Sequence, residues 1–128
     1  MNIKYLSENQ VTATLRGGHA VEQWLGHTDG ETYRTIEWLR IDVLAGGDYC
    51  VSVLDNFDDG NFEYLDIYSF EACDPDALSG VTNIFDELDT AVIFATTECG
   101  ADSKKFVLEG GIQYIYSNFL AEYGLPPK

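Results

Sequence analysis

The segment from Asp55 to Gly60 resembles a cation-binding loop, because it combines three carboxylates with a glycine. A helical calcium loop places oxygen ligands at positions 1, 3 and 5, glycine at position 6 and glutamate at position 12. Counted from Asp55, Asp59 and Gly60 fit this pattern, but position 3 is Phe57 and position 12 is Asp66. We therefore interpret the segment as a turn between strands, and we expect no metal site.

The histidines and cysteines have no spacing that indicates catalysis or metal binding. His19 and His27 lie eight residues apart, whereas a ligand pair on a helix needs a spacing of four. Cys50, Cys73 and Cys99 form no CxxC pair, and an odd number of thiols does not suit a disulfide framework. Phosphate-loop, dinucleotide-binding and serine-hydrolase motifs are absent. We expect reduced thiols, a cytoplasmic location, no cofactor and no enzymatic activity.

The distribution of charge is the strongest signal in the sequence. The 128 residues contain 22 Asp and Glu against 7 Lys and Arg, a formal net charge of −15. Residues 41–103 hold fifteen of these acids and no lysine or arginine. Nucleic acids and anionic membranes select clustered basic residues, so we expect direct binding to neither. The acids predict either a surface that only aids solubility or a surface that attracts a basic partner protein.

The elements that position these residues are predicted to begin with a β-meander. Apolar alternation and short turn signals indicate about five antiparallel strands within residues 11–71. Residues 33–44 carry apolar side chains on both faces, which is typical of a central strand or of one covered on each side. The expected strands are residues 11–16, 19–25 (which also fit a short helix), 33–44, 49–54 and 62–70.

The apolar period changes to that of a helix after residue 76. Two amphipathic helices are expected at about residues 80–98 and 111–123, with Ser79 as N-cap of the first and Gly124 after the second. Residues 105–108 fit a short strand between them. Strands first and helices last indicate an α+β fold, with both helices packed on one face of the sheet. Residues 1–128 are expected to form one domain.

Aromatic and acidic residues gather on the last predicted strand. Phe62, Tyr64, Tyr68 and Phe70 share one face with Asp66. Such a face either packs beneath the helices or binds a protein, because tyrosine is enriched in interface hot spots. In the second case the carboxylates steer association and the tyrosines supply short-range affinity. The predicted partner-binding residues are Asp55, Asp58, Asp59, Glu63, Asp66, Tyr64 and Tyr68.

The size, charge and order of segments resemble those of the small acidic immunity proteins that neutralise bacterial toxins. The resemblance implies a bacterial, non-enzymatic inhibitor that occludes a basic site on its partner, with a nuclease toxin as one fitting partner. It assigns no role to individual residues. Two alternatives stay open: a mimic of nucleic acid, and a small-molecule-binding protein or enzyme with a pocket between the sheet and the helices.

Overall fold

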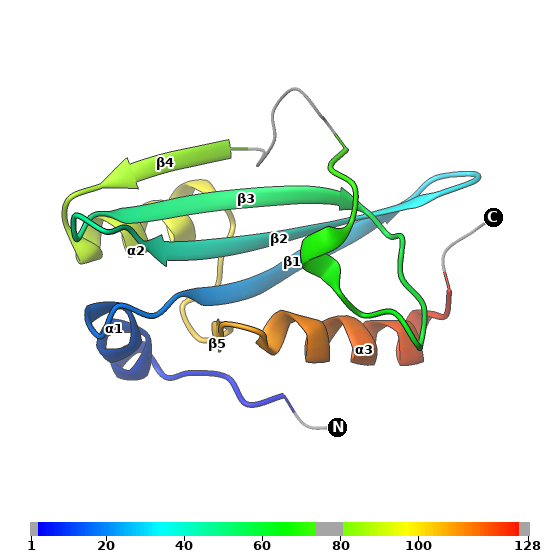
Figure 1. Cartoon of the computed structure of the whole chain (residues 1–128), viewed down its shortest axis with the longest axis horizontal. Helices are drawn as coiled ribbons and strands as arrows, with labels where there is room; N and C mark the ends of the chain where they lie inside the picture. Colours follow the sequence, from blue (N-terminus) through cyan, green and yellow to red (C-terminus); the bar gives the residue numbers. More distant parts are fainter. Residues whose placement is uncertain (1–2, 74–80, 126–128) are drawn as a thin grey trace.

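A computed structural model describes residues 3–73 and 81–125, and it has the predicted α+β architecture (Figure 1). Its sheet has five antiparallel strands in the order β4-β3-β2-β1-β5, so β1 to β4 form a meander. None of the helices in these two ranges is long and apolar enough to cross a membrane. The elements are α1 (Glu8–Arg16), β1 (Val21–Asp29), β2 (Arg34–Val43), β3 (Tyr49–Phe57), the 3₁₀ helix η1 (Ile67–Ser69), β4 (Val81–Phe85), α2 (Leu88–Glu98), β5 (Val107–Leu108) and α3 (Gly111–Tyr123).

The first predicted strand, residues 11–16, is instead part of helix α1. Ser7 and Gln10 form a capping box: the Gln10 amide donates to the Ser7 hydroxyl at 3.2 Å, and the Ser7 amide donates to the Gln10 side chain at 2.8 Å. Val11 and Leu15 are buried on one side of this helix. Their spacing of four suits a helical face as well as it suits strand alternation, and the capping box selects the helix.

The predicted helix at residues 80–98 begins later than expected, because its first part is a strand. Val81–Phe85 forms β4 and pairs with β3 from Val53↔Val81 to Tyr49↔Phe85. Helix α2 then starts at Leu88. The proposed N-cap Ser79 lies outside the described residues. Long-range pairing with β3 therefore overrides the local helical pattern of this segment.

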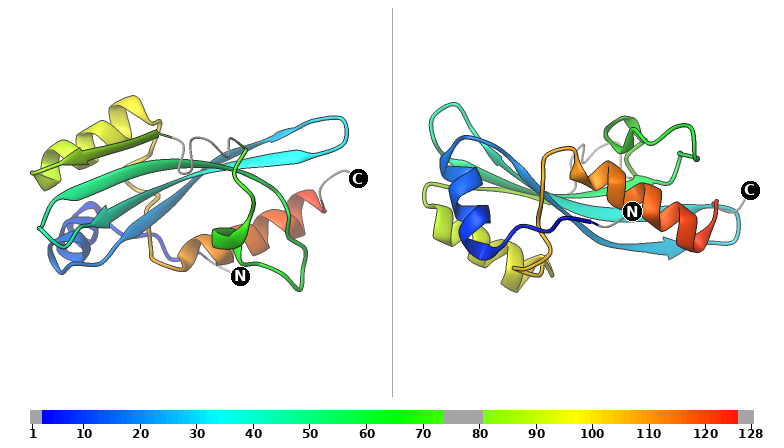
Figure 2. Two further views of the ribbon diagram at one scale, coloured as in Figure 1. Left: turned by 45° about the horizontal axis from the view of Figure 1, so that its top comes forward. Right: turned by 90° about the horizontal axis from the view of Figure 1, so that it is seen from below.

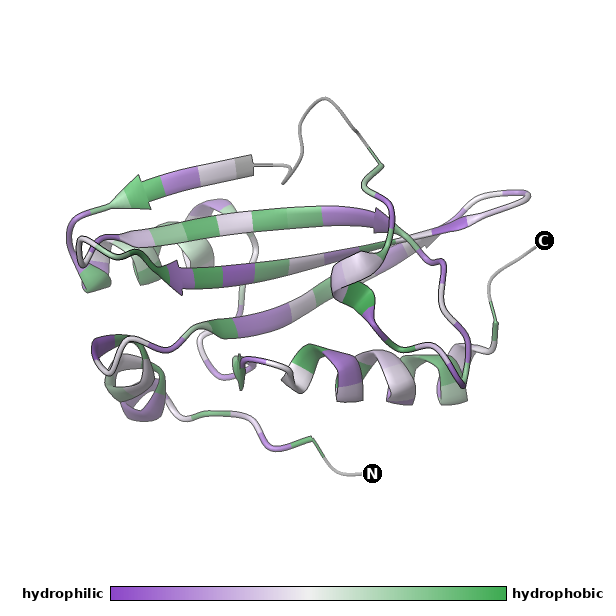
Figure 3. Cartoon of the chain, in the orientation of Figure 1, coloured by the Kyte–Doolittle hydropathy of each residue, from purple (hydrophilic) through white to green (hydrophobic). Residues whose placement is uncertain are grey.

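Both predicted helices pack on the sheet, but on opposite faces of it rather than on one (Figure 2). Leu39 and Ile41 of β2 pack with α1 and α2, whereas Ile36 and Trp38 pack with α3 and η1. Hydrophobic residues recur along β2 between hydrophilic ones (Figure 3), and its buried apolar side chains fall on both faces of the strand. The strand is thus covered on both sides, as its two apolar faces predicted.

The final predicted strand, residues 62–70, is also absent, since β4 occupies the edge of β3. Residues 58–71 instead form a closed loop, which we call the acidic loop. Its ends meet where the Phe57 amide donates to the Glu71 carbonyl at 2.9 Å and the Glu71 amide donates to the Asp59 carboxylate at 3.0 Å. The loop packs onto the sheet and α3 through Ile67 and Phe70.

Gly60 tests how tightly this loop packs. A Cβ at Gly60 would lie 2.6 Å from both the Phe70 ring and the Tyr64 carbonyl oxygen. We expect Gly60→Ala to lower the free energy of unfolding by about 1–3 kcal/mol, because overpacking forces the loop to shift. Urea denaturation followed by circular dichroism measures the change.

Gly46 in the β2–β3 turn is the matched control, because nothing lies within 4 Å of a Cβ placed there. Gly46→Ala should leave stability unchanged or raise it by up to about 1 kcal/mol. Equal effects of the two substitutions would contradict tight packing of the acidic loop.

Candidate functional site

Asp58 holds the start of the acidic loop from inside the protein. Its side chain is fully buried; Oδ2 accepts a hydrogen bond from Arg34 Nε at 2.7 Å, and Oδ1 accepts one from the Tyr116 hydroxyl. Arg34 in turn donates to the Gly124 carbonyl at 2.8 Å and lies 4.5 Å from the centre of the Phe119 ring. Asp58 was predicted to bind a partner, but its carboxylate is used to join the loop to β2 and α3.

Asp55 lies at the base of the loop, in β3. Its register partner is Glu37 on β2, and burial together with the Asp55 charge raises the pKa of Glu37. The Asp55 carbonyl accepts the Cys73 amide at 2.9 Å, and its carboxylate accepts the Cys73 thiol at 3.6 Å. The side chain of Asp55 is exposed, and it lies beside the loop near its closing segment.

The other predicted partner-binding residues are exposed on the acidic loop. Tyr64 and Tyr68 are 41% and 44% exposed, and Phe62, which was not selected from the sequence, is 59% exposed. Glu71, also not selected, is a further exposed acid. The loop thus presents aromatic rings among carboxylates. Its exposed acids are Asp59, Glu63, Asp66 and Glu71.

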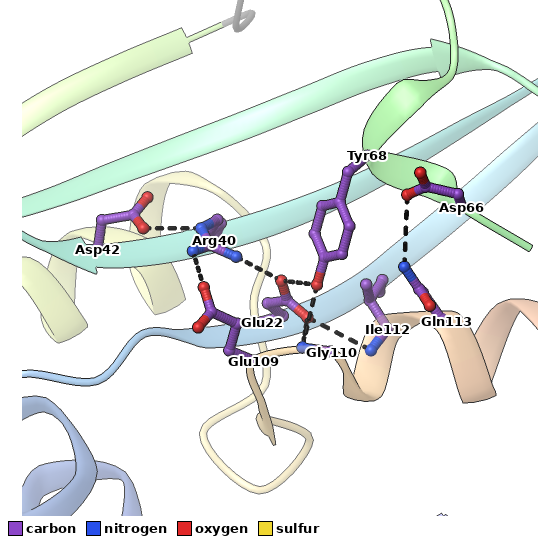
Figure 4. A network of polar contacts seen from close by, with 9 residues as sticks. All are labelled: Glu22, Arg40, Asp42, Asp66, Tyr68, Glu109, Gly110, Ile112 and Gln113. Atoms are coloured by element: carbon purple, nitrogen blue, oxygen red, sulfur yellow. Dashed lines mark hydrogen bonds and ion pairs between the residues drawn. The ribbon is translucent and has the colours of Figure 1, made fainter.

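A second buried carboxylate, Glu22, holds the far part of the loop (Figure 4). Glu22 Oε2 accepts hydrogen bonds from Arg40 Nη1 at 2.6 Å and from the Tyr68 hydroxyl. Glu22 Oε1 accepts the Gly110 and Ile112 amides at 2.9 and 3.4 Å, at the start of α3. A carboxylate is favourable there because helix N-termini carry unpaired N–H groups and a partial positive charge. Tyr68 therefore anchors the loop as well as facing solvent.

Arg40 is surrounded by carboxylates. Besides Glu22, it donates to Asp42 at 2.7 Å and to Glu109. Burial disfavours its charged form, but the hydrogen bonds that Arg40 donates to Glu109 and Asp42 outweigh this and raise the pKa of Arg40. One cation faces three carboxylates, so the cluster stays negative and Arg40 is not free for an external anion.

Sequence analysis missed the role of Glu22. A charged residue between the apolar pairs Ala20-Val21 and Trp24-Leu25 is a weak signal of a buried ion pair. Its partner Arg40 lies eighteen residues away and is opposite Glu22 only in the observed register. The β1–β2 pairing had to be known before the two residues could be connected.

These clusters stabilise the position of the loop through hydrogen bonds. Burial and the Glu22 carboxylate raise the pKa of Tyr68, so this hydroxyl is a hydrogen-bond donor at neutral pH and not a base. Burial and Asp58 do the same to the pKa of Tyr116. Within residues 3–73 and 81–125, no group of three His, Cys, Asp or Glu side chains could hold a metal ion.

A second group of exposed acids lies at the other end of β3. Tyr49 pairs with Phe85, which brings Asp48 and Asp86 to neighbouring positions. Glu87 and Asp89 follow at the start of α2. The nine residues of β3 separate this group from the acidic loop by roughly 27 Å. Two groups of exposed acids thus lie at opposite ends of β3.

The exposed basic residues lie away from the acidic loop in the sequence. Arg34 and Arg40 are occupied by buried carboxylates. Among the described residues, the remaining cations are Lys4, Arg16, Lys104 and Lys105, all exposed. The acidic loop itself contains no basic residue to neutralise its carboxylates.

Comparison with known proteins adds no assignment: the chain matches no protein-family model, no curated protein and no solved structure. Its function is therefore inferred from its own residues.

Tyr68 tests the anchoring of the acidic loop. Tyr68→Phe removes the hydrogen bond to buried Glu22 and should lower the free energy of unfolding by about 1–2 kcal/mol. Tyr114→Phe, at an exposed position of α3, should change it by less than about 0.5 kcal/mol.

The raised pKa of Tyr68 adds a pH dependence to the stability of the protein. The unfolded chain ionises this tyrosine above about pH 10 while the folded chain does not, so the advantage of wild type over Tyr68→Phe should be constant below that pH and shrink above it. An advantage that grows above pH 10 would contradict the assignment.

Cys73 tests the electrostatics at the base of the loop. Burial, the charge and hydrogen bond of Asp55, and the charge of Asp59 raise the pKa of Cys73 to about 11. In a variant with Cys50→Ser and Cys99→Ser, iodoacetamide should therefore alkylate Cys73 much more slowly at pH 8.5 than it alkylates free cysteine, since the thiolate is the nucleophile.

Adding Asp55→Asn should raise that alkylation rate roughly threefold or more, because it removes a negative charge that disfavours the Cys73 thiolate. Asp48→Asn, at the other end of β3, is the matched control and should leave it unchanged. A rate insensitive to Asp55→Asn would show that the two groups do not interact.

Proposed function

We propose that this protein is a non-enzymatic binding protein whose acidic loop occludes a basic site on a partner protein. The observation that carries the proposal is that exposed carboxylates and exposed aromatic rings lie together on a loop that contains no basic residue. A bacterial toxin immunity protein is the class that best fits these properties, with a nuclease toxin as a suitable basic partner. In that role the protein acts in the cytoplasm, beside the toxin's target.

The two kinds of side chain have separate tasks in the proposed complex. Carboxylates such as Glu63 and Asp66 attract the basic partner from a distance and raise the rate of encounter. Phe62, Tyr64 and Tyr68 then bury apolar surface against the partner, as aromatic hot-spot residues do.

The anchoring of the loop supports this proposal. Asp58 and Tyr68 fix it at two points through buried partners, so the free protein already holds the loop in one conformation. Little chain entropy is then lost on binding, which favours affinity. Asp58 contributes to binding only in this indirect way.

Salt-dependent association kinetics test the proposed function. The probe is the protein encoded beside this one, because inhibitors are often encoded next to their targets. We expect its association rate, measured by surface plasmon resonance, to fall roughly tenfold or more between about 50 and about 300 mM NaCl, as steering by charges is screened.

Two triple variants locate the effect. Asp59→Asn/Glu63→Gln/Asp66→Asn on the acidic loop should slow association at low salt by roughly tenfold, since it removes steering charge. Asp48→Asn/Asp86→Asn/Glu87→Gln, with the same change in net charge at the other end of β3, should slow it by less than about threefold. Equal effects of the two triples, a rate indifferent to salt, or no binding at all would contradict the proposal. If duplex DNA competes for the partner at the same site, mimicry of nucleic acid replaces toxin inhibition as the function.

A further inference from the structure

A hollow of about 330 Å³ lies beside β1, away from the acidic loop in the sequence. Trp24 and Leu25 of β1 line it together with Ile115 of α3. The ring of Trp24 is held from the α3 side by Phe119, with ring centres 4.9 Å apart. The volume falls in the range of small-ligand sites, and these walls are apolar, as in most such sites.

The hollow exists because strand pairing stops early at this edge of the sheet. β5 pairs only with Val21 and Glu22, so the described part of β1 beyond Glu22 has no neighbouring strand on that side. Gln23, which is buried, instead bonds the main chain of Asp102: its Nε2 donates to the Asp102 carbonyl at 2.9 Å, and its Oε1 accepts the Asp102 amide at 2.7 Å. These two hydrogen bonds to the backbone fix the rim formed by residues 100–105.

The polar side of the hollow carries a lysine that forms no ion pair with any carboxylate of the described residues. Lys105 lines it, and its ammonium group lies 4.7 Å from the centre of the Tyr5 ring, which also lines the hollow. Asp102 is the carboxylate on the lining, and its Oδ1 accepts the Lys104 amide at 2.9 Å.

The surroundings are the least negative part of the chain. Lys4 and Lys104 flank the lining residues Tyr5 and Lys105 in sequence. Three of the seven basic residues thus belong to the segments that form this rim, in a chain of net charge −15. At physiological salt the Debye length is about 8 Å, so distant acids act weakly here and these local lysines dominate.

We propose that this hollow binds a small molecule with a flat apolar body and one anionic group, such as an aromatic carboxylate or sulfonate. The body lies against Trp24, Leu25 and Ile115, and the anion pairs with Lys105. The proposal is independent of the acidic loop and of any protein partner, since the two sites share no residue.

Fluorescence titration with two probes tests it. The anionic probe is 1-anilinonaphthalene-8-sulfonate, and the matched uncharged probe is N-phenyl-1-naphthylamine. We expect the anionic probe to bind the folded wild-type protein saturably, at one site, with a Kd below roughly 100 µM. Lack of saturable binding overturns the proposal.

Single variants assign the site. Lys105→Gln should weaken binding of the anionic probe roughly tenfold and change the neutral probe by less than about twofold, because only the charge contact is lost. Lys104→Gln, which removes a neighbouring lysine that does not line the hollow, should leave both probes unaffected. Equal effects of Lys104→Gln and Lys105→Gln overturn the proposed role of Lys105.

Ile115→Trp fills the hollow and should weaken both probes. Because Ile115 belongs to α3, the circular dichroism spectrum and urea midpoint of this variant must match wild type; Leu25→Trp provides a second filled variant from β1. Unchanged binding in a folded, filled variant shows that the probe lies elsewhere and overturns the site. The acidic-loop triple should bind both probes as wild type does.

Discussion

The structure depends on two buried carboxylates, Glu22 and Asp58, and on the need to satisfy them fully. A buried charge without partners costs several kcal/mol, so its donors must be held in place. Glu22 is satisfied by Arg40, Tyr68 and the first amides of α3; Asp58 is satisfied by Arg34 and Tyr116. Every buried side-chain nitrogen and oxygen among the described residues has a hydrogen-bond partner. These contacts place α3 and both ends of the acidic loop relative to β1 and β2.

The same pairing shapes the surface. Both arginines of the sheet, Arg34 and Arg40, are paired with buried carboxylates. The exposed acids of the loop then have no nearby arginine to neutralise them, and the remaining cations lie on other segments. A negative loop with aromatic residues and a lysine-bordered apolar hollow are thus separate surfaces of one small fold, suited to different ligands. The first supports binding of a basic protein, and the second supports binding of a small anion.

Local sequence signals predicted some elements and failed where long-range pairing decides. Helix 111–123 was predicted with its observed bounds, because its apolar spacing and Gly124 are local features. Residues 11–16 alternate like a strand, but the capping box of Ser7 and Gln10 makes them part of a helix. Residues 81–85 have helical spacing, and only their pairing with β3 makes them a strand. In the candidate site, the sequence left open whether Tyr64 packs beneath the helices or faces a partner, and burial of Asp58 depends on Arg34, twenty-four residues away.

The central claim is that buried anchors hold the acidic loop rigid before any partner arrives. Backbone ¹⁵N relaxation of the free protein measures this most directly. Order parameters of residues 58–71 should approach those of β2 and β3, about 0.8 or higher. Values below about 0.6 throughout the loop would mean that it is disordered on the nanosecond timescale and would contradict the account.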